Sequence, residues 1–314
     1  MSADVAIIIP TLRRPESLER AIRSALAQTG VETRLREIIV VDNDPLASAR
    51  PTVEHLSGSA LIPVRWCHAP QPGVATARNR GLAETDALLI AFLDDDEEAS
   101  PEWLSALLKA QADLQSDVVF GPIRGRVPPK TGWSRDYLER FFGREGPDAT
   151  QLIDHAYGCG NSLLVRATAL PGPAPFDMAA DQTGGEDDAL FAALAARGGT
   201  FGWAADAWVD EYAPPYRANL GYAFRRAFAY GQTPSQIAYS QGNWPGIVRW
   251  MVIGAGQMIL FGLAALALII VRHPLRAQML DRAARGTGKL LWFRGFEPKF
   301  YGSHELRRLD QAAT

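Results

Sequence analysis

The sequence predicts an α/β protein with a mostly parallel sheet and helices on both faces, followed by a hydrophobic helical segment near the C-terminus. Two observations predict the sheet: short, continuous apolar runs, and amphipathic helical patterns between them. Such runs are typical of strands buried on both faces, and their alternation with helices favours parallel pairing. A third observation, a stretch of 22 residues without a charged side chain, predicts the C-terminal segment.

The expected strands are 5–9, 37–41, 64–67, 88–93, 117–123 and 157–165, and the expected helices are 15–28, 100–114 and 189–196. Pro15 suits a first helical position, and Ser100 followed by Pro101 is a typical helix start. Gly158 and Gly160 permit another segment to approach the backbone closely. At 314 residues, the chain is long enough for one large or two ordinary domains.

Five consecutive carboxylates directly follow the expected strand 88–93: Asp94, Asp95, Asp96, Glu97 and Glu98. In an open α/β sheet, the carboxyl ends of the strands border the ligand crevice. Because adjacent anions repel each other, folding them there requires a compensating cation, and a hard divalent ion holding a diphosphate would provide it. A solvated acidic turn before the next helix is the alternative, and the run by itself favours neither.

A second acidic cluster, Glu186-Asp187-Asp188, follows Gly184-Gly185 and opens the helix at 189–196. A helix cap is the ordinary role of one Asp at such a start. Three carboxylates exceed that need, the two glycines permit a tight turn, and crowding raises carboxyl pKa values toward those of a general base. Taken together, the two clusters indicate an acidic, metal-dependent α/β enzyme.

The charge and the cysteine content indicate which binding partners and which cellular compartment to expect. The net charge of −3 and the pI near 6.0 do not predict nucleic-acid binding. From residue 249 onward there are ten Lys/Arg and four Asp/Glu, so this tail carries +6 and the rest of the chain −9. The excess indicates a basic tail near an anionic surface. Cys67 and Cys159 form no motif and fit a reducing compartment, and Ser2-Ala3-Asp4 lacks a signal-peptide n-region, so we expect a cytosolic N-terminus.

Six segments occur in an order that resembles a known family. They are Pro10-Thr11-Leu12-Arg13-Arg14, residues 37–44, residues 73–82, residues 92–96 with Pro101-Glu102-Trp103-Leu104, Gly160-Asn161 with Arg166, and Gly185-Glu186-Asp187. From residue 5 to about residue 232, the chain resembles glycosyltransferase family 2, which comprises inverting enzymes with a GT-A-type nucleotide-diphospho-sugar transferase fold. The resemblance therefore implies a nucleotide-sugar donor and a metal-dependent, hexosyltransferase-like reaction.

The resemblance implies roles for particular residues. The residues implied to bind the donor are Pro10, Thr11, Asp42, Arg78, Asp94 and Asp95, and those implied to bind Mg²⁺ or Mn²⁺ are Asp96 and Glu211. Asp187 is implied to act as the general base, with Glu186 beside it, and Asn161 and Arg166 are implied to lie on the acceptor side. Two positions depart from the family pattern. Glu211 stands where the family often has a metal-binding His, and Asn43 interrupts a commonly acidic pair, which we expect to affect nucleotide fit.

The uncharged stretch is residues 250–271, and as a helix it would be roughly 33 Å long, enough to span a bilayer. Trp250 lies at one end and Arg272, His273 and Arg276 at the other, as interfacial anchors do. A buried soluble helix is the alternative. One span conflicts with the charges, because both the catalytic part and the basic tail are expected in the cytosol, so a re-entrant or in-plane segment also remains open.

We therefore expect a catalytic domain at 1–235 and a membrane-associated helical region at 236–314. The predicted function is transfer of a sugar to a glycan or lipid-linked acceptor at the cytoplasmic face of the cell membrane, with no nucleic-acid partner. One alternative is a nucleotidyltransferase of related fold, although no Gly-rich phosphate loop lies near the N-terminus. The other is a non-catalytic membrane-bound scaffold, against which the intact Asp94, Asp96 and Asp187 argue.

Overall fold

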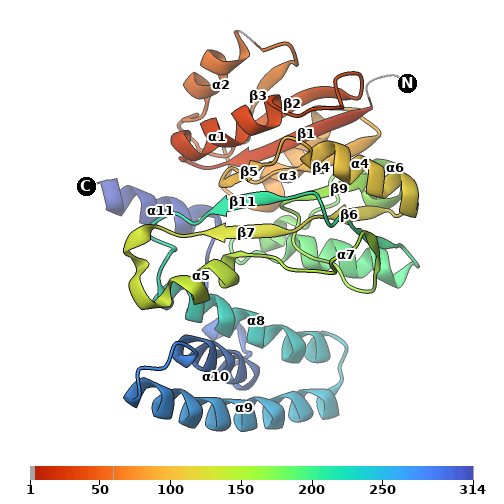
Figure 1. The fold of residues 1–314 in the computed structure, drawn as a ribbon. Helices are drawn as coiled ribbons and strands as arrows, with labels where there is room; N and C mark the ends of the chain where they lie inside the picture. Colours follow the sequence, from red (N-terminus) through yellow and green to blue (C-terminus); the bar gives the residue numbers. More distant parts are fainter. Residues whose placement is uncertain (1–3, 59, 314) are drawn as a thin grey trace. The chain divides into compact units, whose positions relative to one another are not determined.

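The computed structural model describes residues 4–58 and 60–313, which form two compact units (Figure 1). Unit 1 comprises residues up to 124, residues 143–212 and residues from 299 onward, and unit 2 comprises 125–142 and 213–298. The expected boundary at residue 235 falls inside helix α8 (Leu220–Ser240), and the last helix, α11 (Gly302–Ala313), belongs to unit 1. Ser2 and Ala3, on which the expected cytosolic N-terminus rests, lie outside the described residues.

Unit 1 contains an eight-stranded sheet in the order β3-β2-β1-β4-β9-β6-β10-β8. The strands are β1 (Val5–Thr11), β2 (Leu35–Asp42), β3 (Val64–His68), β4 (Leu89–Phe92), β6 (Val118–Phe120), β8 (Gln151–Ile153), β9 (Ser162–Val165) and β10 (Phe201–Trp203). Strands β3, β2, β1 and β4 are parallel. Strand β9 runs antiparallel to both β4 and β6, while β10 is parallel to β6 and antiparallel to β8. The predicted α/β fold is confirmed, with a mixed second half.

The sheet is covered on both faces by helices. They are α1 (Pro15–Leu26), α2 (Arg50–Ser57), α3 (Val74–Ala83), α4 (Trp103–Leu114), α6 (Arg166–Ala169) and α7 (Glu186–Ala196). Along β1, Val5, Ile7 and Ile9 belong to the apolar cluster with α1 and α4, whereas Ala6 and Ile8 belong to the cluster with α3 and α7. Because both faces are buried, the strand sequence is apolar throughout and does not alternate.

Two expected strands are shorter than predicted. The one expected at 117–123 ends at Phe120, because Gly121 lies against the Ala207 carbonyl and Pro122 has no N–H to donate. The one expected at 157–165 begins at Ser162, because Asn161 has a φ of +50° and turns the backbone away from the ladder. Both interruptions bring irregular backbone to the carboxyl end of β4.

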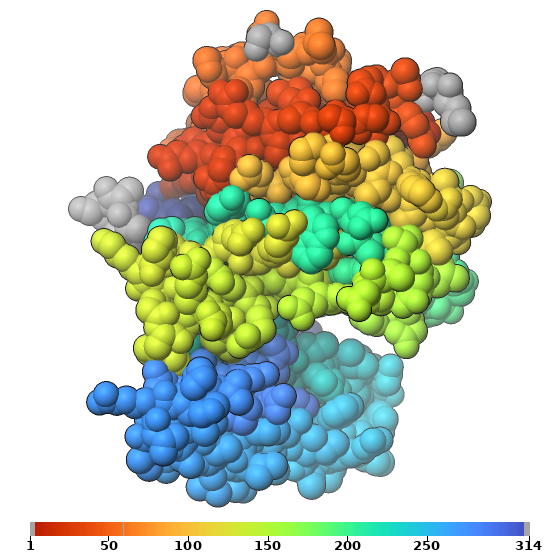
Figure 2. Space-filling model, in the orientation of Figure 1, coloured from red at the N-terminus to blue at the C-terminus, as the bar shows by residue number. Residues whose placement is uncertain are grey.

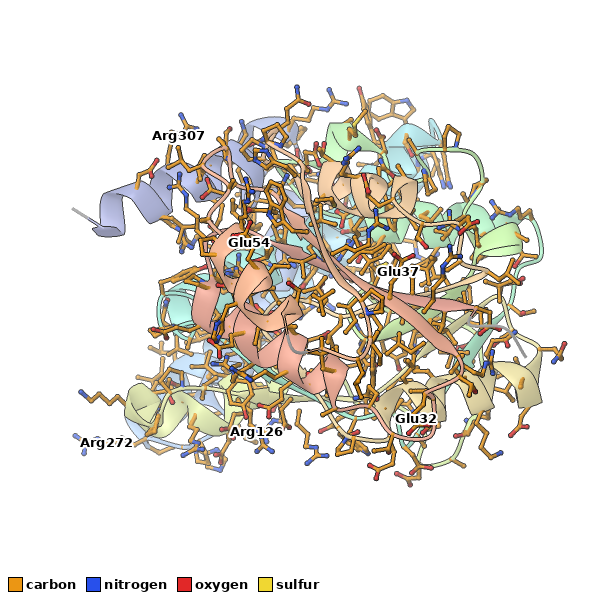
Figure 3. All side chains as sticks on the ribbon, turned by 90° about the horizontal axis from the view of Figure 1, so that it is seen from above. Glu32, Glu37, Glu54, Arg126, Arg272 and Arg307 are labelled. Atoms are coloured by element: carbon orange, nitrogen blue, oxygen red, sulfur yellow. The ribbon has the colours of Figure 1, made fainter. Side chains whose placement is uncertain are left out.

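A three-stranded sheet, in the order β5-β11-β7, adjoins the acidic run. Its strands are β5 (Glu97–Ala99), β11 (Val209–Tyr212) and β7 (Ile123–Arg126). The antiparallel register sets Glu211 opposite Glu97. Figure 3 labels Glu37 on β2 and Arg307 on α11, and shows how densely side chains fill the space around the sheets. Glu37 is buried, where it accepts hydrogen bonds from Thr85 (2.7 Å) and Arg65 (2.8 Å).

Unit 2 is helical. Its elements are η1 (Pro129–Ser134), α5 (Arg135–Phe142), α8, α9 (Trp244–Ile270), α10 (Arg276–Leu290) and η3 (Arg294–Phe296). Helix α10 packs against both α8 and α9. The contacts are close because glycines meet backbone there: Gly286 lies against Gly254 on α9, and Gly288 against Phe228 on α8.

The uncharged stretch at 250–271 lies almost entirely in α9, which begins six residues earlier, at Trp244. Helix α9 has 27 residues, and its most apolar 18-residue window has a mean hydropathy of 2.2 and is only 11% buried. Among the described residues it is the one helix with the length and composition to cross a membrane, which by itself is weak support for a membrane location.

Candidate active site

The acidic run forms a tight turn at the carboxyl end of β4, held by its own fourth residue. The Glu97 carboxylate accepts hydrogen bonds from the backbone N–H of Asp94 (2.9 Å) and of Asn161 (3.2 Å). Gly160 passes so close to Asp94 that a Cβ atom would lie 2.6 Å from its carboxylate, as expected for a close backbone approach. Burial and the neighbouring Asp94 charge raise the pKa of Glu97 well above its ordinary value.

Arg14 supplies part of the positive charge that this run requires. Its Nη1 donates to Asp95 Oδ1 at 2.8 Å and to Asp96 Oδ2 at 2.9 Å. Thr11, at the end of β1, donates its hydroxyl to Asp95 Oδ2 at 2.7 Å. The compensating cation predicted for the run is therefore, in part, an arginine of the chain itself.

Arg78 joins the two acidic clusters. This α3 residue is 4% exposed, and its guanidinium forms an ion pair with Glu186. It also approaches Asp94 Oδ1 at 3.6 Å and Asp187 Oδ2 at 4.0 Å. The rings of Phe92 and Phe176 flank the guanidinium at 5.9 and 5.6 Å. A buried arginine thus unites carboxylates that are about ninety residues apart in the chain.

The second cluster projects from a glycine turn. Gly184 and Gly185 have φ values of +82° and +89°, which favour glycine, and Gly185 is the N-cap of α7. Asp187 Oδ2 accepts a hydrogen bond from the Cys159 N–H at 3.0 Å, and Asp187 Oδ1 accepts one from the Asp188 N–H at 2.9 Å. The Asp187 side chain remains 17% exposed, so a ligand can reach it.

Burial places two carboxyl groups of the site near neutrality. It raises the pKa of Glu186 to about 7, against the opposing effect of Arg78. It raises the pKa of Asp94 to about 6, again opposed by Arg78 and reinforced by the charges of Asp96 and Asp95. Among the described residues, Glu186 Oε2 has no hydrogen-bond partner, so this buried oxygen can still accept a hydrogen bond.

The two predicted metal ligands occur on different elements. Asp96 lies in the acidic turn, and Glu211 on β11, where the next residue, Tyr212, donates its N–H to the Asp96 carbonyl at 2.8 Å. No three His, Cys, Asp or Glu side chains converge as a metal site within residues 4–58 and 60–313. The donor set fits Mg²⁺ or Mn²⁺ chemically, because it consists of carboxylate oxygens.

The predicted nucleoside-binding segment lies where β1 and β2 end side by side. Pro10 pairs with Val41 and Thr11 with Asp42. Asp42 is fully buried, and its Oδ2 accepts from the Ala49 N–H (2.8 Å) and Trp66 Nε1 (3.1 Å). Its observed role is to shape the loop after β2, and its contact with a nucleobase stays a prediction.

The unusual Asn43 has a structural explanation. Its Nδ2 donates to the carbonyls of Ala69 (2.8 Å) and Gln71 (2.7 Å), and its Oδ1 accepts from the Gly73 N–H (2.7 Å). An Asp could not donate the first two bonds. The amide therefore holds the loop that leads into α3 and Arg78.

The two predicted acceptor-side residues differ in position. Asn161 is fully buried beside the acidic turn, where its Oδ1 accepts from Trp103 Nε1 at 2.7 Å and its Nδ2 donates to the carbonyls of Pro122 and Ala207. Arg166 follows the antiparallel strand β9 and binds the Ala87 carbonyl, at the opposite edge of the sheet from Asp94. The structure thus brings Asn161 to the site, and it does not bring Arg166 there.

Two further residues carried no signal in the sequence: Arg144, which lies among the carboxylates of the site, and Asp181, which holds the helix that carries Arg78. Arg144 Nη2 donates to the Gly158 carbonyl at 2.9 Å, and burial lowers its pKa while the nearby Glu97, Glu211, Asp94 and Asp187 oppose that shift. Asp181 accepts from the Thr76 N–H at 3.0 Å and from the Thr76 hydroxyl, which holds the first turn of α3. Both residues lie in irregular segments, where no apolar period marks a functional position.

The parallel strands ending in acidic residues, together with a carboxylate pair on a glycine turn, match the GT-A-type fold that the sequence resemblance implied. The family model for glycosyl transferase family 2 matches residues 6–170. The chain belongs to glycosyltransferase family 2, as its sequence resemblance predicted.

Two curated proteins, among others, are similar to this chain in sequence. The succinoglycan biosynthesis protein ExoM of Rhizobium meliloti (strain 1021) is 31% identical over 96% of this chain and 97% of its own length. A glucosyl-dolichyl phosphate glucuronosyltransferase of Haloferax volcanii is 27% identical over 49% of this chain and 48% of its own.

Two solved structures share the fold. The mannosyltransferase PcManGT of Pyrobaculum calidifontis, in complex with GDP-Man and Mn²⁺, superposes with a TM-score of 0.62 at 15% identity, over 93% of this chain and 88% of that one. TarS 1–349 of S. aureus superposes with a TM-score of 0.54 at 14% identity, over 93% and 91%. At these identities the likeness concerns the fold alone.

Proposed function

We propose that this enzyme is an inverting glycosyltransferase that moves a sugar from a nucleotide-diphosphate donor to a glycan or lipid-linked acceptor at the cytoplasmic membrane face. The observation that carries the proposal is the junction at Arg78, which joins the carboxylate pair of α7 to Asp94 of the donor-side turn. The name of the ExoM relative supports polysaccharide biosynthesis as the process.

Asp187 is the general base in this proposal. Attack by a sugar hydroxyl requires a carboxylate within hydrogen-bond reach of the proton. Glu186 is 3% exposed and its Oε1 is paired with Arg78, whereas Asp187 is partly exposed and is oriented by the Cys159 N–H. Glu186 therefore acts as the partner that holds Arg78 in place.

Stabilisation of the leaving group falls to the cationic side chains. Departure of a nucleoside diphosphate builds negative charge on its oxygens, which guanidinium groups stabilise through charge-assisted hydrogen bonds. Arg14, Arg78 and Arg144 all lie among the carboxylates of the site. A Mg²⁺ or Mn²⁺ ion, held by Asp96 and Glu211, would supply Lewis-acid stabilisation of the same charge. The solved complex of PcManGT with GDP-Man and Mn²⁺ supports a divalent ion and a nucleotide-sugar donor in this proposal.

The proposal is tested by offering a panel of nucleotide sugars to the full-length protein, with Mg²⁺, with Mn²⁺ and with a chelator, and measuring nucleoside diphosphate release. We expect release with at least one donor, its loss with the chelator, and its loss in the Asp96→Ala variant. Pyrophosphate release from a nucleoside triphosphate would instead support a nucleotidyltransferase. Binding of no nucleotide sugar at all would support a scaffold.

A further inference from the structure

One face of α9 is an uninterrupted apolar stripe. We define the α9 stripe as Val248, Val252, Ile259, Leu263, Leu266 and Ile270, whose exposed fractions run from 58% to 75%. Their spacings of three, four and seven residues place them on one side of the helix. In Figure 2, α9 is coloured in blue and lies at the surface of unit 2. An exposed apolar face of this length is typical of a surface that binds a partner or a membrane.

The opposite face of α9 is covered by α10. Gly254 lies against Gly286 and Lys289, and Met258 also approaches Gly286. Farther along, the Arg282 guanidinium lies 5.2 Å from the centre of the Phe261 ring. The two helices therefore run side by side along the middle of α9, where a membrane span would have its centre.

Helix α10 is strongly polar, which restricts how α9 can meet a membrane. It carries Arg276, Asp281, Arg282, Arg285 and Lys289. With 15 residues, it is roughly 22 Å long, shorter than the hydrocarbon core. If α9 crossed the bilayer, these charges would enter the hydrocarbon beside it. Charged side chains there are strongly disfavoured unless they line a pore or an aqueous cavity.

The polar side of α10 forms hydrogen bonds with other helices of unit 2. Asp281 is buried and accepts hydrogen bonds from the Tyr137 hydroxyl (3.0 Å) and from Arg285 Nε (2.8 Å). On α8, Ser235 donates to the Lys289 carbonyl and Gln232 to the Leu291 carbonyl. These bonds connect α10 to α5 and α8, so α10 cannot separate from them without losing the bonds.

The charges and aromatic residues around α9 match a lipid surface. Residues 220–298 contain nine Lys/Arg and two Asp/Glu, a net charge of +7. At the N-terminal end of α9, Tyr239 lies 6.1 Å from Trp244 and 5.0 Å from Trp292, between ring centres. Basic residues attract anionic headgroups, and aromatic rings favour the headgroup region. A second copy of the chain would present the same positive charge and would be repelled.

We propose that α9 lies in the plane of an anionic membrane, with the α9 stripe among the acyl chains and α10 and α8 on the aqueous side. The inference rests on the proposed function only for its setting, the cytoplasmic membrane face. It removes the conflict between the basic tail and a single span, because both ends of α9 stay on the cytoplasmic side of the membrane. Amphipathic helices with a basic polar side bind membranes in this way.

The first test is vesicle flotation of the full-length protein. We expect it to float with vesicles of phosphatidylcholine and phosphatidylglycerol, and at least tenfold less with phosphatidylcholine alone. Leu263→Glu should lower binding to the anionic vesicles at least tenfold. The control Leu61→Glu, at a fully exposed position of unit 1, should bind like the parent. Equal binding of Leu263→Glu and the parent to the anionic vesicles would overturn the proposal. So would a parent protein that does not float and is a dimer, if Leu263→Glu converts that dimer to a monomer.

The second test separates an in-plane helix from a span. Cys67 and Cys159 are both buried, so background labelling is low. Single substitutions Gln241→Cys and His273→Cys place thiols at the exposed positions that flank α9. In closed vesicles made from expressing cells, an impermeant maleimide should label both sites to the same extent. Labelling of one site and protection of the other until detergent is added would show that α9 spans, and would overturn the proposal.

Failure of the proposed function would be recognised separately. Donor-dependent diphosphate release in detergent depends on unit 1 and not on the α9 stripe. Leu263→Glu should therefore retain the parent's release rate and thermal midpoint. A lowered thermal midpoint would mean that the stripe belongs to the folded core, which would also contradict the membrane assignment.

Discussion

The two units distribute polar and apolar groups in opposite ways. In unit 1 the apolar side chains of β1, β2 and β4 are buried on both faces of the sheet, and the charges gather at one edge. In unit 2 the buried positions include Asp281, Lys289 and Ser235, while α9 exposes its apolar side chains. Both units bury apolar clusters away from water, but only unit 2, among the described residues, leaves a long apolar helix largely exposed, as a surface that binds a partner or a membrane does.

Buried charge also differs between the units. Unit 1 buries the carboxyl groups of Asp95, Glu97 and Glu186, and arginines compensate two of them. Unit 2 carries mostly positive charge, and its arginines are exposed or half-buried, whereas Lys289 is buried. The first arrangement is typical of an active site that tunes proton affinity, and the second of attraction to an anionic surface.

The largest expected effect distinguishes catalysis from folding in unit 1. Asp187→Asn keeps the size of the side chain but removes its ability to take a proton, so turnover should fall by about 10²–10⁴-fold. Donor affinity and the thermal midpoint should stay close to those of the parent. Asp188→Asn is the control, because this neighbour is exposed in the first turn of α7. Full turnover by Asp187→Asn would remove Asp187 from the role of base.

The next effect tests the charge balance of unit 1. Arg78→Met should lower the free energy of unfolding by about 3–5 kcal/mol, because it leaves buried carboxyl groups without their partner. Chemical denaturation measures the change. Arg80→Met, on the same helix, removes a more exposed ion pair with Glu84 and should lower it by less than about 1 kcal/mol. Equal losses from the two variants would contradict a central role for Arg78.

A third prediction concerns pH. Burial raises the pKa of Glu186 from 4.5 to about 7, so the folded state binds this proton more tightly than the unfolded state does. The resulting stabilisation is complete below pH 4.5 and is lost as the pH rises through 7. Its order of magnitude is about 3 kcal/mol, at about 1.4 kcal/mol for each pKa unit. In Glu186→Gln, the thermal midpoint should fall less between pH 4.5 and 7.5 than in the parent. An identical fall would refute the assignment.

The smallest effect concerns the packing of α9 on α10 in unit 2. A Cβ at Gly286 would lie 2.7 Å from the Gly254 carbonyl oxygen, so Gly286→Ala should destabilise unit 2 by about 1–3 kcal/mol. A Cβ added at Gly262 would meet no described atom beyond its chain neighbours and its own helix backbone within 4 Å, and Gly262→Ala should instead stabilise the helix by at most about 1 kcal/mol. Thermal melting of both variants in detergent would show whether the difference has this sign.

The sequence by itself determined the class of fold, the approximate positions of β1, β2, β3, β4, β6 and β9, and the two acidic clusters, whereas β5, β7, β8, β10 and β11 were not predicted. These features are local: a buried strand is apolar wherever it lies, and the run from Asp94 to Glu98 is visible without its partners. The order of the motifs also identified the family. The limits of β6 and β9 were missed because Gly121 and Asn161 lie against backbone that is distant in the sequence.

Only the tertiary structure decided which groups meet. The partners of the carboxylates, Arg14 and Arg78, lie about eighty and one hundred residues away along the chain, and no sequence pattern encodes such pairs. It also separated Asn161, buried beside the acidic turn, from Arg166 at the other edge of the sheet. Finally, it divided a uniformly apolar α9 into a face that packs on α10 and a face that remains exposed. Hydropathy depends on composition, whereas burial depends on which distant segment packs against each side.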